Sequence, residues 1–480
     1  MSYADYEAVI GLEVHAELKT ESKIFCSCAT SFGAEPNTHC CPVCLGFPGA
    51  MPTLNRRAIE LAVMAGAALN CEISQLSHID RKQYFYPDLP TAYQISQAGI
   101  PLCQNGYLDI PIDEGELRVG ITRIHVEEDA GKLIHTGEHT LIDCNRCGIP
   151  LIEIVSAPDL RTGKQAAAYV RALRSILSTC EISDGRMQEG SLRCDVNISV
   201  RRRTDMGLGT RTEIKNLNSF SFIEKAIDYE FARHCALLEN GEQVAMETRR
   251  FDPASGKTYP MRAKERVSDY RFLSEPDLPP IYLSSDEIDA LRRALPELPV
   301  ARTARICRDY GVRPYDAAVL TADKALADYY EAAAKQTTHP RIALNLLLSD
   351  LLHICTSDPF LSPLSPTRLA ELAQLLGDGV INSATAKKLL LRLAKDDFDV
   401  REIVEREGLA QIRDESILKA AILDVLKEQA RAVEDYRKGK TNALRSLQGQ
   451  LMARMQGKAD PILAERLLRQ ALETVADEVT

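Results

Sequence analysis

The chain has 480 residues and a formal net charge of −10, and 45% of its residues are hydrophobic. This length exceeds what one hydrophobic core usually supports, so we expect two or three globular domains. The acidic balance argues against a general nucleic-acid coat protein, because sequence-independent binding depends on neutralising phosphates. No apolar run of about 18 residues occurs, and the chain starts with neither a basic region nor an apolar core, so we expect a cytoplasmic protein without membrane contact. The 14 cysteines are then best interpreted as reduced thiols.

The first predicted strand lies at residues 9–18, VIGLEVHAEL. Side chains alternate between the two faces of a strand, so Leu12 lies on an apolar face, while Glu13, His15 and Glu17 share the other. That polar face is either a solvated edge or a place where carboxylates and an imidazole meet at a metal ion. These ten residues alone do not distinguish the two interpretations.

A cysteine-rich segment follows, FCSCATSFGAEPNTHCCPVCLG. It contains two short pairs, Cys26 with Cys28 and Cys41 with Cys44, separated by twelve residues. Four thiolates on two short knuckles are what a closed tetrahedral zinc site needs. Free thiols are the alternative, but two pairs at this separation favour zinc. A further CNRC at 144–147 has no second pair near it in the sequence, so we interpret it as ordinary thiols.

Helices and strands alternate up to about residue 290, which predicts an α+β fold for this part. Apolar residues recur about every 3.6 positions in three segments, which predicts helices at 55–69, 164–180 and 219–239. Gly241 is a natural stop for the last of them. The glycine-bearing DMGLG predicts a connection between two strands, at 192–201 and 210–217.

Carboxylates interrupt several otherwise apolar segments. Glu127, Glu128 and Asp129 fall in ITRIHVEEDAGK, Glu153 in PLIEIV and Asp195 in LRCDVNISV. Each alone is equally well explained as an edge charge, but a buried carboxylate is costly unless it is paired or binds a cation. Several on separate strands predict a sheet with an acidic face, and such oxygen ligands suit Mg²⁺ and nucleotide chemistry.

The chain has no Walker A loop. Its two GKT sequences, at 256–258 and 439–441, lack the glycine that this motif requires five positions before its own second glycine. Any ATP site must therefore be of another kind, with metal ions held on a sheet.

The C-terminal part is predicted to be helical. Four prolines between residues 276 and 296 separate it from the first part. One of its helices is expected to begin with Ser365 as N-cap and Pro366 in the first turn. Residues 437–469 contain eight basic and two acidic residues, a net charge of +6. This segment is either a solvated face or a contact for an RNA backbone.

Several segments resemble, in the same order, the B subunit of the tRNA-dependent aspartyl/glutamyl-tRNA amidotransferase, the GatB family. They are VIGLEVHAEL, CCPVCLGFPGAMPTLN, YFYPDLPTAYQISQ, ITRIHVEEDAGK, DCNRCGIPLIEIVSAPD, GSLRCDVNISV, TEIKNLNSF and YRFLSEPDLPP. The C-terminal GKTNALRSLQGQLMARMQGKADP resembles the tail domain of the same family. The resemblance therefore covers essentially the whole chain.

The resemblance implies a ligase that uses ATP to amidate misacylated Glu-tRNA(Gln) or Asp-tRNA(Asn). In this family, the B subunit phosphorylates the side-chain carboxylate, and ammonia from the A subunit, an amidase, displaces the phosphate. A small C subunit completes the heterotrimer. The implied architecture is a glutamine-synthetase-like cradle at 1–292, an all-α helical domain at 293–405 and a tRNA-binding α-helical tail at 406–480.

The resemblance also implies the functional residues. Magnesium-binding positions of the family fall on Glu13, His15, Glu128 and Glu153, and the catalytic carboxylate Asp195 is expected to be a fifth. Lys82, Arg193 and Lys215 face the same site and are expected to contact phosphate, Arg193 and Lys215 as the residues that bind ATP. The zinc knuckle of the family matches Cys26, Cys28, Cys41 and Cys44. Cys144 and Cys147 depart from the residues usual at their positions, so neither is expected to be essential.

Two other functions stay open on the sequence. A free-standing ligase for a small acid would act without tRNA, and the basic segment and the missing glutaminase signature argue against it. A zinc-bearing RNA-binding adaptor would have no chemistry, and the strand carboxylates argue against that. The sequence does not set whether Asp or Glu is the side chain that is amidated.

Overall fold

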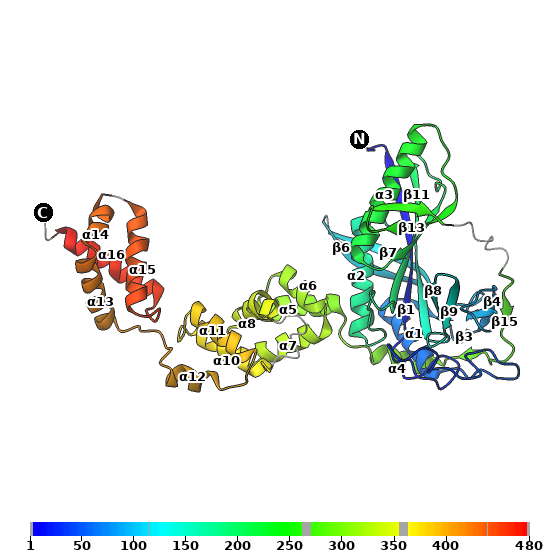
Figure 1. Cartoon of the computed structure of the whole chain (residues 1–480), viewed down its shortest axis with the longest axis horizontal. Coiled ribbons are helices and arrows are strands. Elements are labelled where there is room, and N and C mark those ends of the chain that lie inside the picture. The colour runs from blue at the N-terminus through cyan, green and yellow to red at the C-terminus, as the bar shows by residue number, and fades with distance from the viewer. Residues whose placement is uncertain (1–2, 114, 262–269, 355–362, 439, 478–480) are drawn as a thin grey trace. The chain divides into compact units, whose positions relative to one another are not determined.

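The computed structural model of the chain describes residues 3–113, 115–261, 270–354, 363–438 and 440–477. The chain divides into two compact units, one formed by residues 1–302 and 321–324, and the other by residues 303–320 and 325–480. The first unit mixes helices with a large sheet, and the regular structure described for the second is helical (Figure 1). The α+β expectation for the first part is thus confirmed in outline.

A nine-stranded sheet forms the centre of the first unit (Figure 1). The strand order is β14-β13-β12-β11-β1-β10-β7-β6-β2, and all neighbours are antiparallel except the parallel pair β12 and β13. The predicted pair around DMGLG is confirmed as β11 and β12. The strands of this sheet are β1 (Tyr6–Glu17), β2 (Glu72–Ile73), β6 (Cys103–Ile112), β7 (Gly115–Glu128), β10 (Pro150–Ser156), β11 (Leu192–Arg202), β12 (Thr212–Leu217), β13 (Glu247–Asp252) and β14 (Lys257–Pro260).

The three predicted helices of this unit are confirmed. They are α1 (Arg56–Ala68), α2 (Gly163–Thr179) and α3 (Phe220–Glu239), and α4 (Ser285–Arg293) follows. Asn55, Thr162 and Ser219 cap the first three, because their side chains accept hydrogen bonds from the first-turn backbone. Gly241 has φ 76° and donates its N–H to the carbonyl oxygen of Leu238, 3.1 Å away, which ends α3.

The two faces of the sheet differ in polarity. Leu12, Val14 and Val196 belong to one apolar core together with residues of α1, α2 and α3, which lie against the sheet (Figure 1). Glu13 and His15 alternate with these residues on β1 and are less buried, so the predicted two-faced strand is confirmed. The helices therefore leave the opposite face to polar side chains.

Within its described residues, the first unit also has three smaller sheets. The three-stranded one lies beside the end of β7, because the hydroxyl of Ser96 on β5 donates a hydrogen bond to Oε1 of Glu127 on β7 over 2.8 Å. The order β15-β4-β5 describes this sheet, and β16 pairs with β3 and β8 with β9. These strands are β3 (Leu76–Ser77), β4 (Asp80–Gln83), β5 (Tyr93–Ser96), β8 (Lys132–Thr136), β9 (His139–Asp143), β15 (Leu273–Ser274) and β16 (Ile281–Tyr282).

The helical part has two apolar cores, one built from residues between Ile306 and Val404 and the other from residues between Leu418 and Leu472. Ser365 caps a helix that has Pro366 in its first turn, as predicted. Within the described ranges, no helix has the length and apolar content needed to cross a bilayer. The helices are α5 (Pro299–Tyr310), α6 (Pro314–Thr321), α7 (Lys324–Ala334), α8 (Pro340–Asn345), the π-helix η2 (Leu346–Leu351), α9 (Leu352–Ile354), α10 (Pro366–Gly377), α11 (Ser383–Leu393), α12 (Val400–Arg406), α13 (Glu415–Glu428), α14 (Ala430–Arg437), α15 (Thr441–Arg454) and α16 (Pro461–Asp477).

Candidate functional site

The polar face of the large sheet brings charged residues of separate strands into register. On β1, Glu13 pairs with Asp195 of β11, and His15 pairs with Glu153 of β10. Glu153 pairs in turn with His125 of β7. Side chains of directly paired residues lie on the same face, close enough to interact. The strand register thus gathers residues that are far apart in the sequence.

One group on this face has the donors of a metal site. Single ligand atoms of His15, Glu127 and Glu153 all lie within 4.8 Å of one another. Nε2 of His15 is 3.5 Å from Oε2 of Glu153. Burial raises the pKa of Glu153, but hydrogen bonds from His125 and His15 outweigh it and hold that pKa below its usual range. One imidazole and two carboxylates fit a divalent cation.

His125 joins the two carboxylates of this group. Its Nε2 lies 3.1 Å from Oε1 of Glu127 and 3.4 Å from Oε2 of Glu153. Burial lowers the pKa of His125, but the two carboxylates outweigh this and raise it to about 9. Glu127 also accepts hydrogen bonds from Gln94 and Ser96 of β5. The strand pairing and these hydrogen bonds fix the Glu127 carboxylate in one orientation.

A second carboxylate group lies beside the first and already contains a cation. Ligand atoms of Glu13, Asp195 and Glu213 lie within 4.8 Å of one another. Nζ of Lys215 is 2.9 Å from Oδ2 of Asp195 and 2.9 Å from Oε1 of Glu213. Burial lowers the pKa of Lys215, but these two carboxylates outweigh it and hold the ammonium charged. Each group thus contains a cation, Lys215 in this one and His125 in the first, and only the first also offers an imidazole ligand, that of His15.

Arg193 and Lys82 bring positive charge to the same region. Nη2 of Arg193 lies 2.6 Å from Oδ2 of Asp129, and its buried Nε has no hydrogen-bond partner among the described residues. Such a donor can accommodate an anionic oxygen of a ligand. Nζ of Lys82 lies 5.1 Å from the centre of the Tyr270 ring. Burial raises the pKa of Glu127, but His125 and the charge of Lys82 outweigh it and lower that pKa to about 2.

Glu128 is not brought together with the other residues expected to bind magnesium. It follows Glu127 on the same strand, so the two side chains leave opposite faces. Its Oε1 accepts a hydrogen bond from the N–H of Ile95 over 2.8 Å. Its carboxyl lines a cavity of about 150 Å³ together with Cys26 and Cys44. Burial raises the pKa of Glu128 to about 8. The structure thus puts Glu127, not Glu128, beside His15.

His125 and Glu213 were not among the residues expected from the sequence, and Glu127 was noted only as one of three adjacent acids, with Glu128 taken as the ligand. Two of them carried a readable signal, because His125 and Glu127 are two positions apart in RIHVEED and so share a strand face. Glu213 likewise stands two positions before Lys215 in TEIKNL. The alternation was present, but nothing in it distinguishes the adjacent Glu127 and Glu128.

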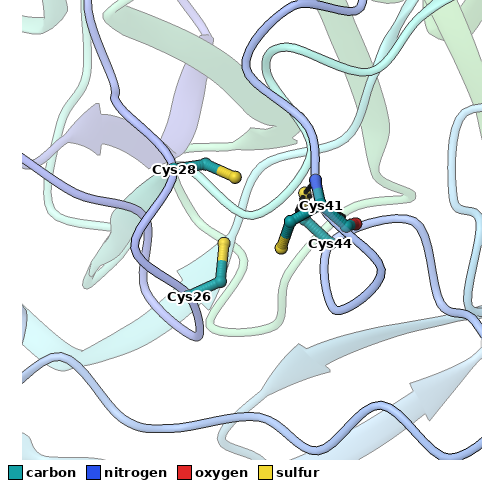
Figure 2. A group of neighbouring side chains, drawn as sticks. All are labelled: Cys26, Cys28, Cys41 and Cys44. Carbon is teal, nitrogen blue, oxygen red and sulfur yellow. Dashed lines mark hydrogen bonds between the residues drawn. The ribbon is translucent and has the colours of Figure 1, made fainter.

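The four cysteines of the predicted zinc knuckle converge (Figure 2). Cys26 and Cys28 lie on one segment, Cys41 and Cys44 on another, and the side chains point toward one another. The four sulfur atoms lie within 4.8 Å of one another, and Sγ of Cys41 and Cys44 are 3.9 Å apart. Four sulfurs at about 2.3 Å from zinc would be about 3.8 Å apart in a tetrahedron. The donor set therefore fits zinc.

Cys144 and Cys147 are buried thiols outside this group of four. Burial raises the pKa of both. Although they are distant in sequence, the structure places their turn against the knuckle, because Nζ of Lys23 donates to the carbonyl oxygen of Cys144 over 3.2 Å and lies 3.7 Å from Sγ of Cys44.

The basic segment at 437–469 is largely neutralised by acids from outside it. Arg454 pairs with Asp424 over 3.1 Å, and Arg466 pairs with Glu415 over 2.7 Å. Residues 406–480 contain 13 basic and 12 acidic residues, a net charge of +1. The +6 count therefore overstates the positive charge of this region, because it leaves out the acids of α13 and α14.

Two family models match the chain. The model described as the GatB/GatE catalytic domain matches residues 8–289, and the one described as the GatB domain matches residues 328–472. The first contains all residues of the polar face discussed above and the four cysteines.

Curated relatives match over nearly the full length. A protein of Caldicellulosiruptor bescii is 48% identical over 480 residues, which cover 98% of this chain and 100% of the relative. One of Caldanaerobacter subterraneus is 50% identical over 471 residues, covering 97% and 99%. One of Carboxydothermus hydrogenoformans is 47% identical over 476 residues, covering 98% and 99%. Each is named as the B subunit of an aspartyl/glutamyl-tRNA(Asn/Gln) amidotransferase.

Proposed function

The chain belongs to the GatB family of amidotransferase B subunits, and from this premise we propose how its polar sheet face serves the reaction. The protein is the B subunit of the carbon–nitrogen ligase that amidates misacylated Glu-tRNA(Gln) or Asp-tRNA(Asn) in protein biosynthesis. The meeting of His15, Glu127 and Glu153 on one face is the observation that carries the proposal.

The chemistry requires activation of a poor electrophile. A side-chain carboxylate oxygen attacks the terminal phosphorus of ATP, the bond to ADP breaks, and an acyl phosphate forms. Ammonia then attacks the acyl carbon, phosphate leaves with the bonding electrons, and a proton from the nitrogen passes to solvent. Water would destroy the acyl phosphate, so the site has to exclude it.

We assign the metal-binding role to His15, Glu127 and Glu153. A magnesium ion held there would neutralise phosphoryl oxygens as negative charge develops on them. His125 orients the two carboxylates by contacting both of them. The Nε donor of Arg193 and the ammonium of Lys82 would bind phosphate oxygens. Glu13, Asp195 and Glu213 form a second acidic group, which the ammonium of Lys215 neutralises in part.

The proposal includes the architecture of the family. Residues 1–292 would form the glutamine-synthetase-like cradle, whose polar face is backed by α1, α2 and α3. Residues 293–405 would form the helical domain and 406–480 the tRNA-binding tail, which fits the presence of separate apolar cores in these ranges. The four cysteines would hold a structural zinc ion.

The naming of the relatives as B subunits implies an enzyme of several subunits. We propose that an amidase partner, the A subunit, releases ammonia from glutamine and that a small C subunit completes a cytoplasmic heterotrimer. The sequence of this chain has no glutaminase signature of its own, which supports an external source of ammonia.

The test is amide formation by the chain co-purified with its partner subunits. The complex is given ATP, glutamine and either Glu-tRNA(Gln) or Asp-tRNA(Asn), and the aminoacyl group is analysed after its release from the tRNA. We expect ATP-dependent formation of Gln or Asn on the tRNA, and no amidation of free glutamate or aspartate. Amidation of a free acid without tRNA would overturn the proposal in favour of a small-molecule ligase.

A further inference from the structure

Lys23 is a buried lysine beside the cysteine group. Its exposed fraction is 0%. Its Nζ donates to the carbonyl oxygens of His39, 2.7 Å away, and Cys144, 3.2 Å away, and lies 3.7 Å from Sγ of Cys44. Within the described part of the chain, these are the polar contacts of this ammonium, and none is to a carboxylate.

A buried ammonium is costly unless a negative charge compensates it. Four thiolates around one divalent zinc ion leave a net charge of about −2 on the centre. The ammonium of Lys23 therefore lies next to this negative charge, because it contacts Sγ of Cys44, one of the four sulfur atoms. The buried cation and the anionic centre compensate one another.

The same side chain joins two loops. His39 belongs to the loop that carries Cys41 and Cys44, and Cys144 begins the turn at 144–147. Further hydrogen bonds join these two loops. The N–H of His39 donates to Oδ1 of Asn145 over 2.8 Å, and the N–H of Cys144 donates to Oδ1 of Asn37 over 2.8 Å.

The turn at 144–147 is also connected to the polar face of the sheet. The N–H of Gly148 donates to the carbonyl oxygen of Asp129 over 3.0 Å, and Asp129 binds Arg193 over 2.6 Å. A chain of contacts thus runs from the cysteine group through the turn to an arginine of the candidate site.

We propose that Lys23 is the counter-ion of the four-cysteine zinc centre, a positioning residue that balances its charge and fastens the knuckle to the turn at 144–147. The inference rests on the zinc site proposed above. It assigns Lys23 an electrostatic role, which differs from filling space in the core.

The experiment measures zinc affinity of the full chain by competition with a chelator. Lys23→Met should weaken zinc binding by about 10- to 100-fold, the usual effect of losing a partner outside the metal ligands. The matched control is Lys19→Met, which changes an exposed lysine and should leave the affinity unchanged. Lys23→Gln keeps a hydrogen-bond donor without the charge, and it serves as the second variant if Lys23→Met does not fold.

Two readouts separate charge from packing. In a Cys28→His background the centre carries one negative charge fewer, so Lys23→Met should cost much less affinity there. With Co²⁺ in place of zinc, the sulfur-to-metal charge-transfer band should move to longer wavelength in Lys23→Gln, because the positive charge near sulfur is lost.

The two ways in which the inference can fail are distinguishable. If the unaltered chain binds no zinc, the zinc site itself is wrong, and the inference about Lys23 falls with it. If the unaltered chain binds zinc and Lys23→Gln binds it equally tightly with an unshifted cobalt spectrum, the zinc site stands and the role of Lys23 is refuted.

Discussion

Nε2 of His15 lies 3.5 Å from Oε2 of Glu153, and the two residues are directly paired on the neighbouring antiparallel strands β1 and β10. A shift of either strand by one residue would move its side chain to the apolar face. The apolar alternation that builds the core therefore also fixes the geometry of the polar group.

Replacing Lys215 tests whether its ammonium occupies a position that a metal ion could take. Lys215→Met leaves Glu13, Asp195 and Glu213 facing one another without their ammonium, so thermal stability should fall. Magnesium should restore part of that stability, because a cation can then occupy the group. The measurement is the melting temperature with and without magnesium, with Lys225→Met, on an exposed position of α3, as control. Equal magnesium responses in both variants would contradict this role.

The buried carboxyl of Glu128 should make stability depend on pH. Its folded-state pKa is about 8, above the ordinary value of 4.5, so the folded state binds this proton more tightly than the unfolded state. The contribution of the Glu128 carboxyl to stability is fully present below about pH 4.5 and is lost as the pH rises through about 8. The free energy of unfolding should therefore fall over this range, by at most about 1.4 kcal/mol per pH unit for one proton.

The Glu128→Gln variant should lose that part of the pH dependence. Denaturant unfolding at a series of pH values measures it, with the exposed Glu138→Gln as control. Parallel curves for Glu128→Gln and the unaltered chain would show that Glu128 is ionised in the folded protein.

Metal analysis tests whether the four-cysteine group, and not the pair at 144–147, binds zinc. The chain should contain about one zinc ion, and changing Cys41 and Cys44 to Ser should remove it and lower the melting temperature. Cys147→Ala should retain zinc, because this thiol lies outside the four-sulfur group. Unchanged zinc in the double variant, or its loss in Cys147→Ala, would refute this assignment.

The tail should bind tRNA through lysines that are exposed, Lys438 and Lys440, or half-buried, Lys458. Lys438 pairs with Glu434 over 2.6 Å and Lys440 with Asp435 over 2.8 Å, but exposed ion pairs are weak, so phosphates can compete for these lysines. Neutralising Lys438, Lys440 and Lys458 should weaken tRNA binding. The slope of log K against log salt is negative, and each lost phosphate contact should make it shallower by roughly 0.7–0.9.

Binding measured at several salt concentrations checks the tail prediction, and catalysis at saturating tRNA should survive. Neutralising three exposed lysines of the first unit, Lys19, Lys132 and Lys225, is the matched control. If both triple variants have the same affinity and salt slope as the unaltered complex, the tail lysines do not contact tRNA.

Local patterns in the sequence were enough for much of the fold. The cap at Ser365 and the stop at Gly241 act within one turn, so their signals are complete in the sequence. The two-faced strand at 9–18 likewise follows from alternation alone.

Contacts between distant segments were harder to predict. The ion pairs of Arg454 and Arg466 with acids of α13 depend on helix packing, so counting charges in one segment overstated the basic surface. The position of Lys23 between two loops depends on contacts across more than 100 residues, and no local pattern signals it. Glu127 and Glu128 are adjacent and chemically identical, so only the strand register tells which one lies beside His15.

The most direct test compares Glu127→Gln with Glu128→Gln in the complete complex. The measurement is transfer of labelled terminal phosphate from ATP to the aminoacyl group of misacylated tRNA, without an ammonia source. We predict that Glu127→Gln lowers this rate at least about 100-fold, since it removes a charge from the group that would hold magnesium. Glu128→Gln should form the acyl phosphate at nearly the normal rate, because its side chain lies on the other face. A normal rate in Glu127→Gln together with a lost rate in Glu128→Gln would contradict the account.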